Sequence, residues 1–163
     1  MSRAATPALA ALSAAQVPHE VLRYRHDPRQ VSFGTEAVEQ LTTAAGVAPE
    51  QIYKTLILAV PGGLAVAVLP VPAKLALKAA TAALGVARAT MADPAVAQRS
   101  TGYVVGGISP FGQRRALPTV VDSSALDFEK VLCSAGQRGC DVAVAPTDLI
   151  RLTGATTADI QAR

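Results

Sequence analysis

Hydrophobic residues fall into short runs separated by turn-forming residues along most of the chain. The clearest example is a pair of runs, residues 55–60 and 64–69, that are rich in Val, Ile and Leu and flank Pro61-Gly62-Gly63. Two apolar runs of strand length around such a turn predict a β-hairpin. The whole uncharged stretch approaches the length of a membrane span, but the turn divides it, so a hairpin explains it better.

Five segments carry the signals of helices. Thr6-Pro7 and Asp93-Pro94 each place a capping residue before a proline that suits the first helical position. Gly46 and Gly85 directly follow two other segments and Gly154 lies just beyond a third, which provides the usual end of a helix. The predicted helices cover residues 7–15, 35–45, 73–84, 94–98 and 146–152.

The remaining apolar runs predict strands in an irregular order with the helices. Besides the hairpin, the expected strands cover residues 21–25, 102–105, 117–121, 130–134 and 140–145, and residues 106–112 are expected to form a loop. Strands joined by short turns, with helices placed irregularly between them, favour an α+β domain with a mixed, barrel-like sheet over a doubly wound sheet. No linker or internal repeat divides the chain, so residues 1–163 are expected to form a single domain.

The composition agrees with one well-packed domain. Of the 163 residues, 50% are hydrophobic and 17% are charged, which excludes a disordered chain. Fifteen basic and twelve acidic residues leave a net charge of +3, too small to identify a partner. The beginning of the chain has no continuous apolar core of a signal peptide, and a reducing cytoplasm is the expected compartment.

Several familiar catalytic and binding motifs are missing from the sequence. It contains no GxSxG, HExxH or GxxxxGK[ST] pattern, and its only histidines are His19 and His26. Cys133 and Cys140 form neither a CxxC pair nor a cluster with those histidines, so neither a structural zinc site nor a disulfide framework is expected. Cys133 lies in an apolar run and is expected to be a buried side chain rather than a reactive thiol.

Lys54 is the first candidate for chemistry, because it is one of only four lysines and begins an apolar strand. A partly desolvated ammonium there would stabilise a developing negative charge. The alternative is a lysine at a strand end that reaches into water. The second candidate is Gly106-Gly107 before Ile108, whose backbone N–H groups could face an anion or a carbonyl oxygen, or could simply form a turn.

Other polar and aromatic residues leave two interpretations open. Arg138 and Asp141 could orient a ligand amine or form a surface hairpin contact. Tyr24 and Phe33 could stack on an adenine or belong to the core. The arginines near Tyr24 and the pair Arg114-Arg115 could contact a nucleic-acid backbone or form an ordinary solvated face.

A set of ordered motifs resembles the YbaK family of bacterial aminoacyl-tRNA deacylases. The matching motifs are Phe33-Gly34, Gln51-Ile52-Tyr53-Lys54-Thr55-Leu56, Met91-Ala92-Asp93-Pro94, Ala97-Gln98-Arg99-Ser100-Thr101-Gly102-Tyr103, Val105-Gly106-Gly107-Ile108-Ser109-Pro110 and Arg138-Gly139. They recur in order from about Tyr24 to Leu152. The resemblance extends to the editing domain that is inserted in many bacterial prolyl-tRNA synthetases.

The resemblance implies a compact α+β fold and specific site residues. It implies catalytic roles for Lys54, Gly106 and Gly107. It also implies that the substrate is bound by Tyr24, Phe33, Thr55, Ile108, Ser134 and Asp141, and that neither a metal nor another cofactor is needed. The implied partners are a mischarged tRNA, Cys-tRNA(Pro), and prolyl-tRNA synthetase, with no membrane.

The implied reaction is the trans-editing of Cys-tRNA(Pro), and the implied substrates extend to Cys-tRNA(Cys). In the family, the cysteine thiol is thought to attack its own ester, which would make the enzyme a thiolactone-forming lyase rather than a hydrolase. One alternative is a deacylase that removes another small residue, such as alanine, with water as the nucleophile. The other is a non-catalytic module that binds tRNA or the synthetase.

Overall fold

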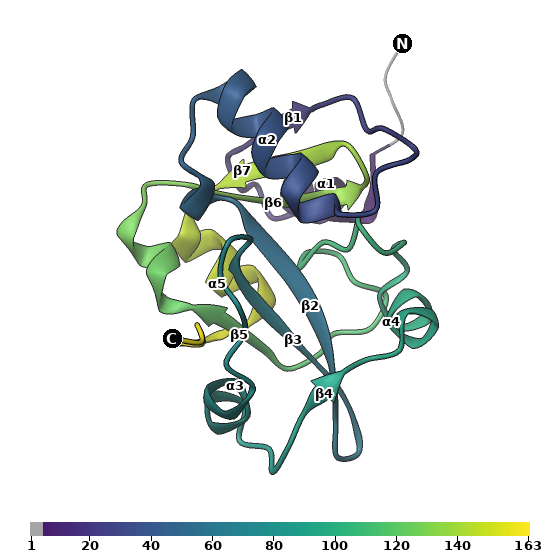
Figure 1. Ribbon diagram of the computed structural model, residues 1–163, viewed down its shortest axis with the longest axis vertical. Coiled ribbons are helices and arrows are strands. Elements are labelled where there is room, and N and C mark those ends of the chain that lie inside the picture. The colour runs from purple at the N-terminus through teal and green to yellow at the C-terminus, as the bar shows by residue number, and fades with distance from the viewer. Residues whose placement is uncertain (1–4) are drawn as a thin grey trace.

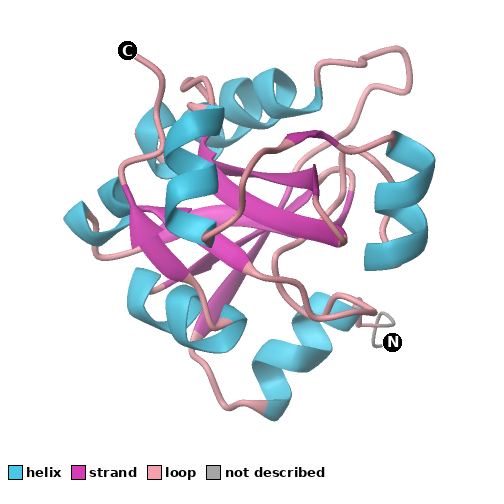
Figure 2. Ribbon diagram, turned by 90° about the horizontal axis from the view of Figure 1, so that it is seen from below, coloured by secondary structure: helices cyan, strands magenta, loops and turns pink. Residues whose placement is uncertain are grey.

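The computed structural model describes residues 5–163, which form two β-sheets surrounded by helices (Figures 1 and 2). The prediction about the beginning of the chain falls partly on residues 1–4, outside the described residues. None of the helices in the described range is long and apolar enough to cross a membrane.

The smaller sheet has three antiparallel strands in the order β1-β7-β6. Its strands are β1 (His19–Arg23), β7 (Cys140–Val144) and β6 (Val131–Gln137). Helix α2 (Phe33–Ala45) packs Ala37 and Leu41 on one face, and α1 (Pro7–Ala14) packs on the other, against β6. Both faces of this sheet are therefore covered by helices, and side chains of α2 and the sheet meet directly.

The larger sheet is mixed and has five strands in the order β4-β2-β3-β5-β8. The predicted hairpin forms its centre, as β2 (Tyr53–Val60) and β3 (Gly63–Pro70). Strand β4 (Thr90–Met91) is antiparallel to β2, whereas β5 (Thr119–Asp122) and β8 (Thr156–Ala158) extend the sheet in parallel. Helix α3 (Leu77–Leu84) packs on β5 and β8, while α4 (Pro94–Thr101) and α5 (Pro146–Thr153) contribute to the main core on the opposite face.

A single bridge joins the sheets. Ile52 pairs in parallel with Leu132, after which β2 turns away from β6. The main core, which includes Val66, Val121, Cys133 and Val142, lies between the two sheets. The predicted α+β class with a mixed sheet is confirmed, with the strands divided between two connected sheets.

The predicted helix starts at proline are confirmed. Helices α1, α4 and α5 begin at Pro7, Pro94 and Pro146. The Thr6 hydroxyl accepts the Leu9 N–H at 3.2 Å, and the Asp93 carboxylate accepts the Ala95 N–H at 2.8 Å. Each side chain satisfies an N–H that the helix itself leaves without a partner.

Two predicted elements are wrong, and local hydrogen bonds explain both. Residues 102–105 form a turn rather than a strand, because Gly102 ends α4 with φ +82° and the Gly107 N–H returns to the Val104 carbonyl. Helix α3 starts at Leu77 instead of residue 73. Residues 74–76 instead pair with the end of the chain, where the Ala76 N–H donates to the Ile160 carbonyl at 2.7 Å.

Other strand boundaries moved by a few residues. β1 covers His19–Arg23 rather than residues 21–25, because its pairing with β7 ends where Arg23 meets Cys140. β6 continues to Gln137, so the turn before β7 is shorter than predicted. The short edge strands β4 and β8 were not predicted.

Candidate functional site

A cavity of about 330 Å³ opens where β2 and β6 separate beyond the Ile52–Leu132 bridge. β4 pairs only with the far end of β2, at Leu58 and Ala59, so the edge of β2 near Thr55 is open to the cavity. The volume falls within the range of small-molecule sites. The described residues that line it are Tyr24, Phe33, Gly34, Ala37, Ile52, Tyr53, Lys54, Thr55, Leu56, Ile57, Val71, Met91, Ala92, Pro94, Ala97, Val105, Gly106, Ile108, Ser134 and Asp141.

The structure brings eight of the nine predicted site residues to this one cavity. Those eight are Tyr24, Phe33, Lys54, Thr55, Gly106, Ile108, Ser134 and Asp141. Gly107 is the exception. A Cβ at Gly107 would lie 2.8 Å from the Cα of Gln137, so this glycine lets the loop pack directly on the β6–β7 hairpin.

Asp141 and Ser134 are cross-strand partners on the face of the small sheet that α2 covers. Asp141 is only 5% exposed. Burial disfavours the charged carboxylate and raises the pKa of Asp141 to about 7. Burial and the nearby Asp141 also raise the pKa of Tyr24, so its hydroxyl remains a donor at neutral pH.

The buried carboxylate predicts a pH-dependent stability that Asp141→Asn should remove. Between pH 4 and pH 7 the folded protein holds a proton that the unfolded chain has lost, so the free energy of unfolding falls as pH rises through this window. Over the whole window, the free energy of unfolding should fall by roughly 4 kcal/mol. In urea unfolding, Asp141→Asn should match the wild type near pH 4 and exceed its stability at pH 8. If the variant and the wild type are equally stable at pH 4 and also at pH 8, the raised pKa of Asp141 is contradicted.

Two residues of the cavity wall, Phe33 and Gly106, pack together, and Arg138 packs on the Phe33 ring from outside the lining. The guanidinium carbon of Arg138 lies 4.5 Å from the centre of the Phe33 ring, a cation–π contact. On Gly106, with φ +88°, a Cβ would lie 2.5 Å from the nearest ring atom of Phe33. Both the backbone conformation and the available space therefore require glycine at this position.

Two side chains hold the loop before Gly106 by its Val105 peptide group. Gln98 of α4 accepts the Val105 N–H at 2.9 Å, and Nε of Arg138 donates to the Val105 carbonyl at 2.8 Å. The Gly107 N–H is already used, since it donates to the Val104 carbonyl at 2.9 Å. The N–H groups of Gly106 and Ile108 donate to no other group of the described chain, and both residues line the cavity, so these are the donors that we consider for a ligand.

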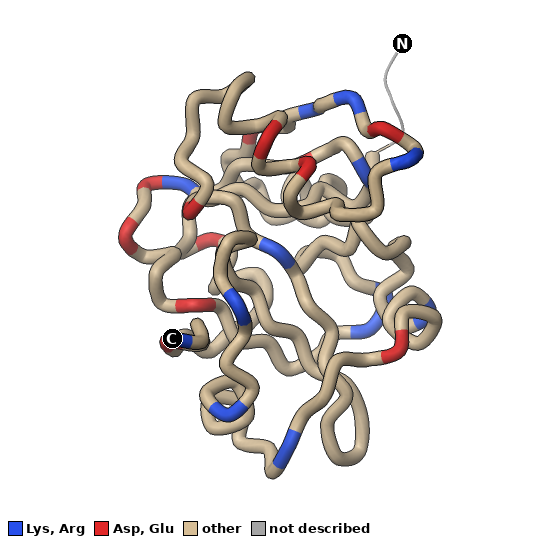
Figure 3. Tube along the Cα trace, viewed as in Figure 1, with Lys and Arg blue, Asp and Glu red and all other residues tan. Residues whose placement is uncertain are grey.

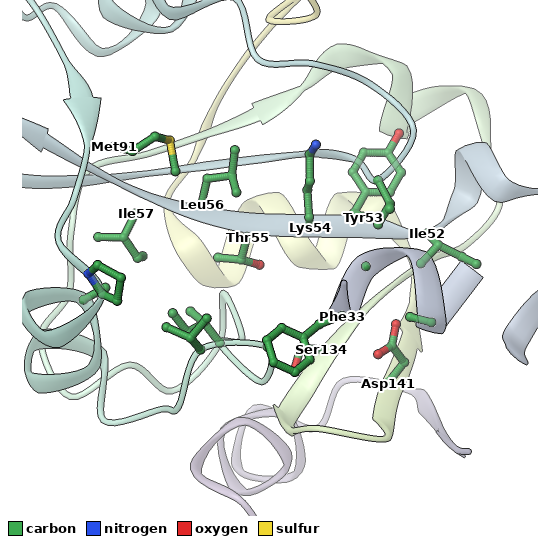
Figure 4. Close-up of a pocket in the computed structure, with 18 of the residues that line it drawn as sticks. Phe33, Ile52, Tyr53, Lys54, Thr55, Leu56, Ile57, Met91, Ser134 and Asp141 are labelled. Atoms are coloured by element: carbon green, nitrogen blue, oxygen red, sulfur yellow. The ribbon is translucent and has the colours of Figure 1, made fainter. Parts of the chain in front are cut away.

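Lys54 and Thr55 lie on opposite faces of β2, as consecutive strand residues must. In Figure 4 the Lys54 side chain points away from Phe33 and Ser134, and its Nζ donates to the Ala73 carbonyl at 2.6 Å. Burial lowers the pKa of Lys54. Thr55 extends from the side of β2 that faces Phe33 and Ser134, and its buried Oγ1 has no hydrogen-bond partner in the described chain.

A buried polar network behind Phe33 was not predicted from the sequence. Glu36, 5% exposed, places Oε1 2.7 Å from Nδ1 of His26 and accepts the Asp27 N–H at 2.8 Å. The network fixes the loop that leads into α2, and the His26 ring lies 5.8 Å from that of Phe33. A glutamate in the first turn of a helix is common, so the sequence carried no signal for this role.

Within residues 5–163, no group of three or more His, Cys, Asp or Glu side chains is placed to hold a metal ion. Cys133 and Cys140 are buried in the main core, and neither lines the cavity. Burial raises the pKa of Cys133 well above the usual value, which keeps this thiol protonated. The cavity therefore offers backbone donors, one lysine, one buried carboxylate and hydroxyl groups for chemistry.

Comparison with known proteins agrees with this geometry. Residues 34–152 match the model of the aminoacyl-tRNA editing domain. This chain belongs to that family. The editing domain also resembles the "Putative Cys-tRNA(Pro)/Cys-tRNA(Cys) deacylase EbsC" of Enterococcus faecalis, with 31% identity over 125 residues, or 76% of each chain. The protein is therefore an enzyme of the aminoacyl-tRNA deacylase type, and its substrate includes tRNA.

Solved structures show the same fold. One, described as a "putative trans-editing enzyme for prolyl tRNA synthetase", has a TM-score of 0.82 and 23% identity, covering 99% of this editing domain and 100% of that chain. Another, described as "hypothetical protein APE2540", has a TM-score of 0.79 and 26% identity, covering 93% and 96% of the two chains. The predicted family resemblance is confirmed.

Proposed function

We propose that this editing domain removes cysteine from Cys-tRNA(Pro), with the substrate's own thiol as the nucleophile. The observation that carries this proposal is the chemistry of the cavity wall. No histidine or cysteine is among the described residues that line the cavity. The hydroxyl of Ser134 accepts the Gly136 N–H, and that of Tyr53 pairs with Ser124, so neither has the basic partner that activates a nucleophile.

The substrate can supply the missing nucleophile. The thiol of cysteine has a pKa near 8.5, so a useful fraction is thiolate at neutral pH. When this sulfur attacks the ester carbonyl, a C–S bond forms, the C–O bond to the ribose breaks, and the thiol proton goes to the ribose oxygen. The products are a four-membered thiolactone and a tRNA with a free 3′ end, and water then opens the thiolactone to cysteine.

The residues of the cavity suit distinct parts of this substrate. The unused N–H groups of Gly106 and Ile108 would stabilise the negative charge on the carbonyl oxygen. Asp141, after loss of its proton, would hold the α-ammonium, and the unpartnered Thr55 hydroxyl would bind the aminoacyl group. Lys54, on the other face of β2, would bind the terminal ribose or phosphate, and Phe33 and Tyr24 would pack on the adenine.

A need for this reaction follows from the size of the amino acids. Cysteine and alanine are about as small as proline, and a hydrophobic pocket discriminates poorly between side chains that differ by one group. A second site that removes the smaller residue corrects the error. We propose that prolyl-tRNA synthetase is the partner that selects tRNA(Pro) and delivers it to this domain.

The test compares tRNA(Pro) charged with cysteine, alanine or serine, and Cys-tRNA(Cys), in one deacylation assay. We expect the Cys-charged substrates to react fastest and the initial product to be captured as thiolactone. A faster reaction with Ala-tRNA(Pro) would instead show that water is the nucleophile. Added prolyl-tRNA synthetase should increase the preference for Cys-tRNA(Pro) over Cys-tRNA(Cys). Binding without turnover of any of these would support a non-catalytic module.

The two protein thiols are expected to be dispensable for turnover. Cys133→Ala and Cys140→Ala should each keep kcat on Cys-tRNA(Pro) within about twofold, although the lost packing should cost about 1 kcal/mol of stability. Chemical denaturation of the same preparations checks the stability part. A loss of about 100-fold in kcat from either folded variant would indicate a protein nucleophile instead.

A further inference from the structure

A second cavity, of about 770 Å³, lies on the other side of α4 from the first. Pro94 and Ala97 of α4 line the first cavity, whereas Val96, Arg99 and Ser100 line the second, as the helical spacing requires. The tip of the β2–β3 hairpin, Val86, and Arg114, Arg115, Leu117 and Pro118 form the rest of its wall. One helix thus separates two cavities, and a helix with its side chains is only about 10–12 Å across.

The wall of the second cavity is basic. Arg99, Arg114 and Arg115 line it, and no aspartate or glutamate is among its lining residues. None of these three arginines takes part in the ion pairs found within residues 5–163. Figure 3 shows Lys and Arg positions gathered at and beside α4. The cavity therefore carries positive charge that the described chain does not neutralise.

Two details of this wall suit a polar ligand. Arg114 is exposed and lies against the end of α4: its Nε is 3.6 Å from where a Cβ of Gly102 would lie, and its backbone N–H donates to the Thr101 carbonyl. The Ser100 Oγ is buried and has no hydrogen-bond partner in the described chain. A hydroxyl without a partner and arginines outside the ion pairs line the same cavity. This combination suits a phosphate, which accepts hydrogen bonds from both kinds of group.

We propose that the second cavity binds backbone phosphates of the tRNA acceptor stem, while the aminoacyl end enters the first cavity. The proposal rests on the proposed function for the identity of the RNA. The location of the site does not depend on that function, because the phosphates would lie on the other side of α4 from the ester. Arginine suits this contact because its planar guanidinium can form two hydrogen bonds to one phosphate.

The main experiment measures binding of an uncharged RNA minihelix with a single-stranded 3′ end, by fluorescence anisotropy between 50 and 200 mM salt. The variant is Arg99→Gln/Arg115→Gln, which leaves Arg114 in place against α4. The control, Arg151→Gln/Arg163→Gln, makes the same change in net charge at arginines that belong to other ion pairs. Thermal unfolding verifies that both variants are folded.

The Arg99/Arg115 variant should reduce the slope of log K against log salt by about 2, one for each lost phosphate contact. Its affinity at 100 mM salt should fall by about tenfold to a hundredfold, while the control keeps the wild-type slope. An unchanged slope in the Arg99/Arg115 variant would overturn the proposal. Binding of inorganic phosphate is measured on the same proteins. If the Arg99/Arg115 variant no longer binds inorganic phosphate but binds the minihelix like the wild type, the proposal is also overturned.

A kinetic comparison separates this proposal from the proposed function. On full Cys-tRNA(Pro) the Arg99/Arg115 variant should show a raised KM, and its loss of kcat/KM should be at least about ten times greater than on cysteinyl-adenosine, which has no stem. Equal losses on the two substrates would overturn the second site. If the wild type deacylates neither, the proposed function fails, and the minihelix titration still decides whether the cavity binds RNA.

Discussion

Replacing Gly106 with alanine is expected to lower kcat/KM on Cys-tRNA(Pro) by about 100-fold or more. The new Cβ would lie 2.5 Å from the Phe33 ring, at a residue with φ +88°. Phe33 cannot move freely, because Arg138 packs on its ring and also holds the Val105 carbonyl. The loop must therefore shift, and it takes the Gly106 and Ile108 N–H groups away from the position that we propose for the ester. Misplacement by about 1 Å is enough for a loss of this size.

Gly85→Ala is a matched control for this variant. Gly85 also has a positive φ, +71°, but nothing lies within 4 Å of the position where its Cβ would be. It therefore carries the same kind of backbone strain without a steric clash, far along the chain from the cavity. Its kcat/KM should remain near the wild-type value. If both alanine variants deacylate like the wild type, the position of the 106–108 loop is not what the reaction requires.

The local parts of the fold could be predicted from the sequence because their signals are local. A capping side chain, a proline at the first helical position and a Pro-Gly-Gly turn act on the residues beside them. Residues 74–76 show the limit of such signals. Their Ala, Lys and Leu side chains favour a helix, yet pairing with residues 160–162 keeps them extended. No local sequence signal in this segment indicates that it pairs with residues at the other end of the chain.

The short strands were missed for a related reason. β8 has the sequence Thr-Thr-Ala, too short to show an alternation, and it is a strand because β5 lies beside it. The error at residues 102–105 is the opposite one: a strand was predicted where the structure has none. Tyr103, Val104 and Val105 favour extended chain, but Gly102 ends α4 and the chain closes into a turn that the Gln98 side chain holds.

For the site, the sequence indicated residue types and the resemblance supplied their grouping. Spacing alone could not show that Lys54 and Thr55 face opposite sides of an open strand edge. It also could not separate Gly107, whose N–H is already used inside the turn, from Gly106 and Ile108, whose N–H groups remain available. The network of His26 and Glu36 depends on contacts across ten residues and a change of element, which no motif records.

Replacing Lys54 with alanine is expected to remove most deacylation, with a loss of about 100-fold or more in kcat/KM, and to leave the protein folded. Lys54 lies at the cavity, is partly buried and donates to one backbone carbonyl, so its removal costs the fold a single hydrogen bond. The reaction loses the only cation among the described residues that line this cavity. Single-turnover deacylation of Cys-tRNA(Pro), with thermal unfolding of the same sample, measures both parts.

The division of that loss between kcat and KM identifies what Lys54 binds. A raised KM with little change in kcat would mean that the amine holds the terminal ribose or phosphate in both the ground state and the transition state. This is the result we expect, because the Lys54 side chain points away from Phe33 and Ser134. A fall in kcat alone would mean that the amine leaves the Ala73 carbonyl and stabilises the developing oxyanion. Lys78→Ala, which removes an exposed charge from α3, should change neither constant, and a Lys54→Ala enzyme with wild-type kcat/KM would exclude both roles.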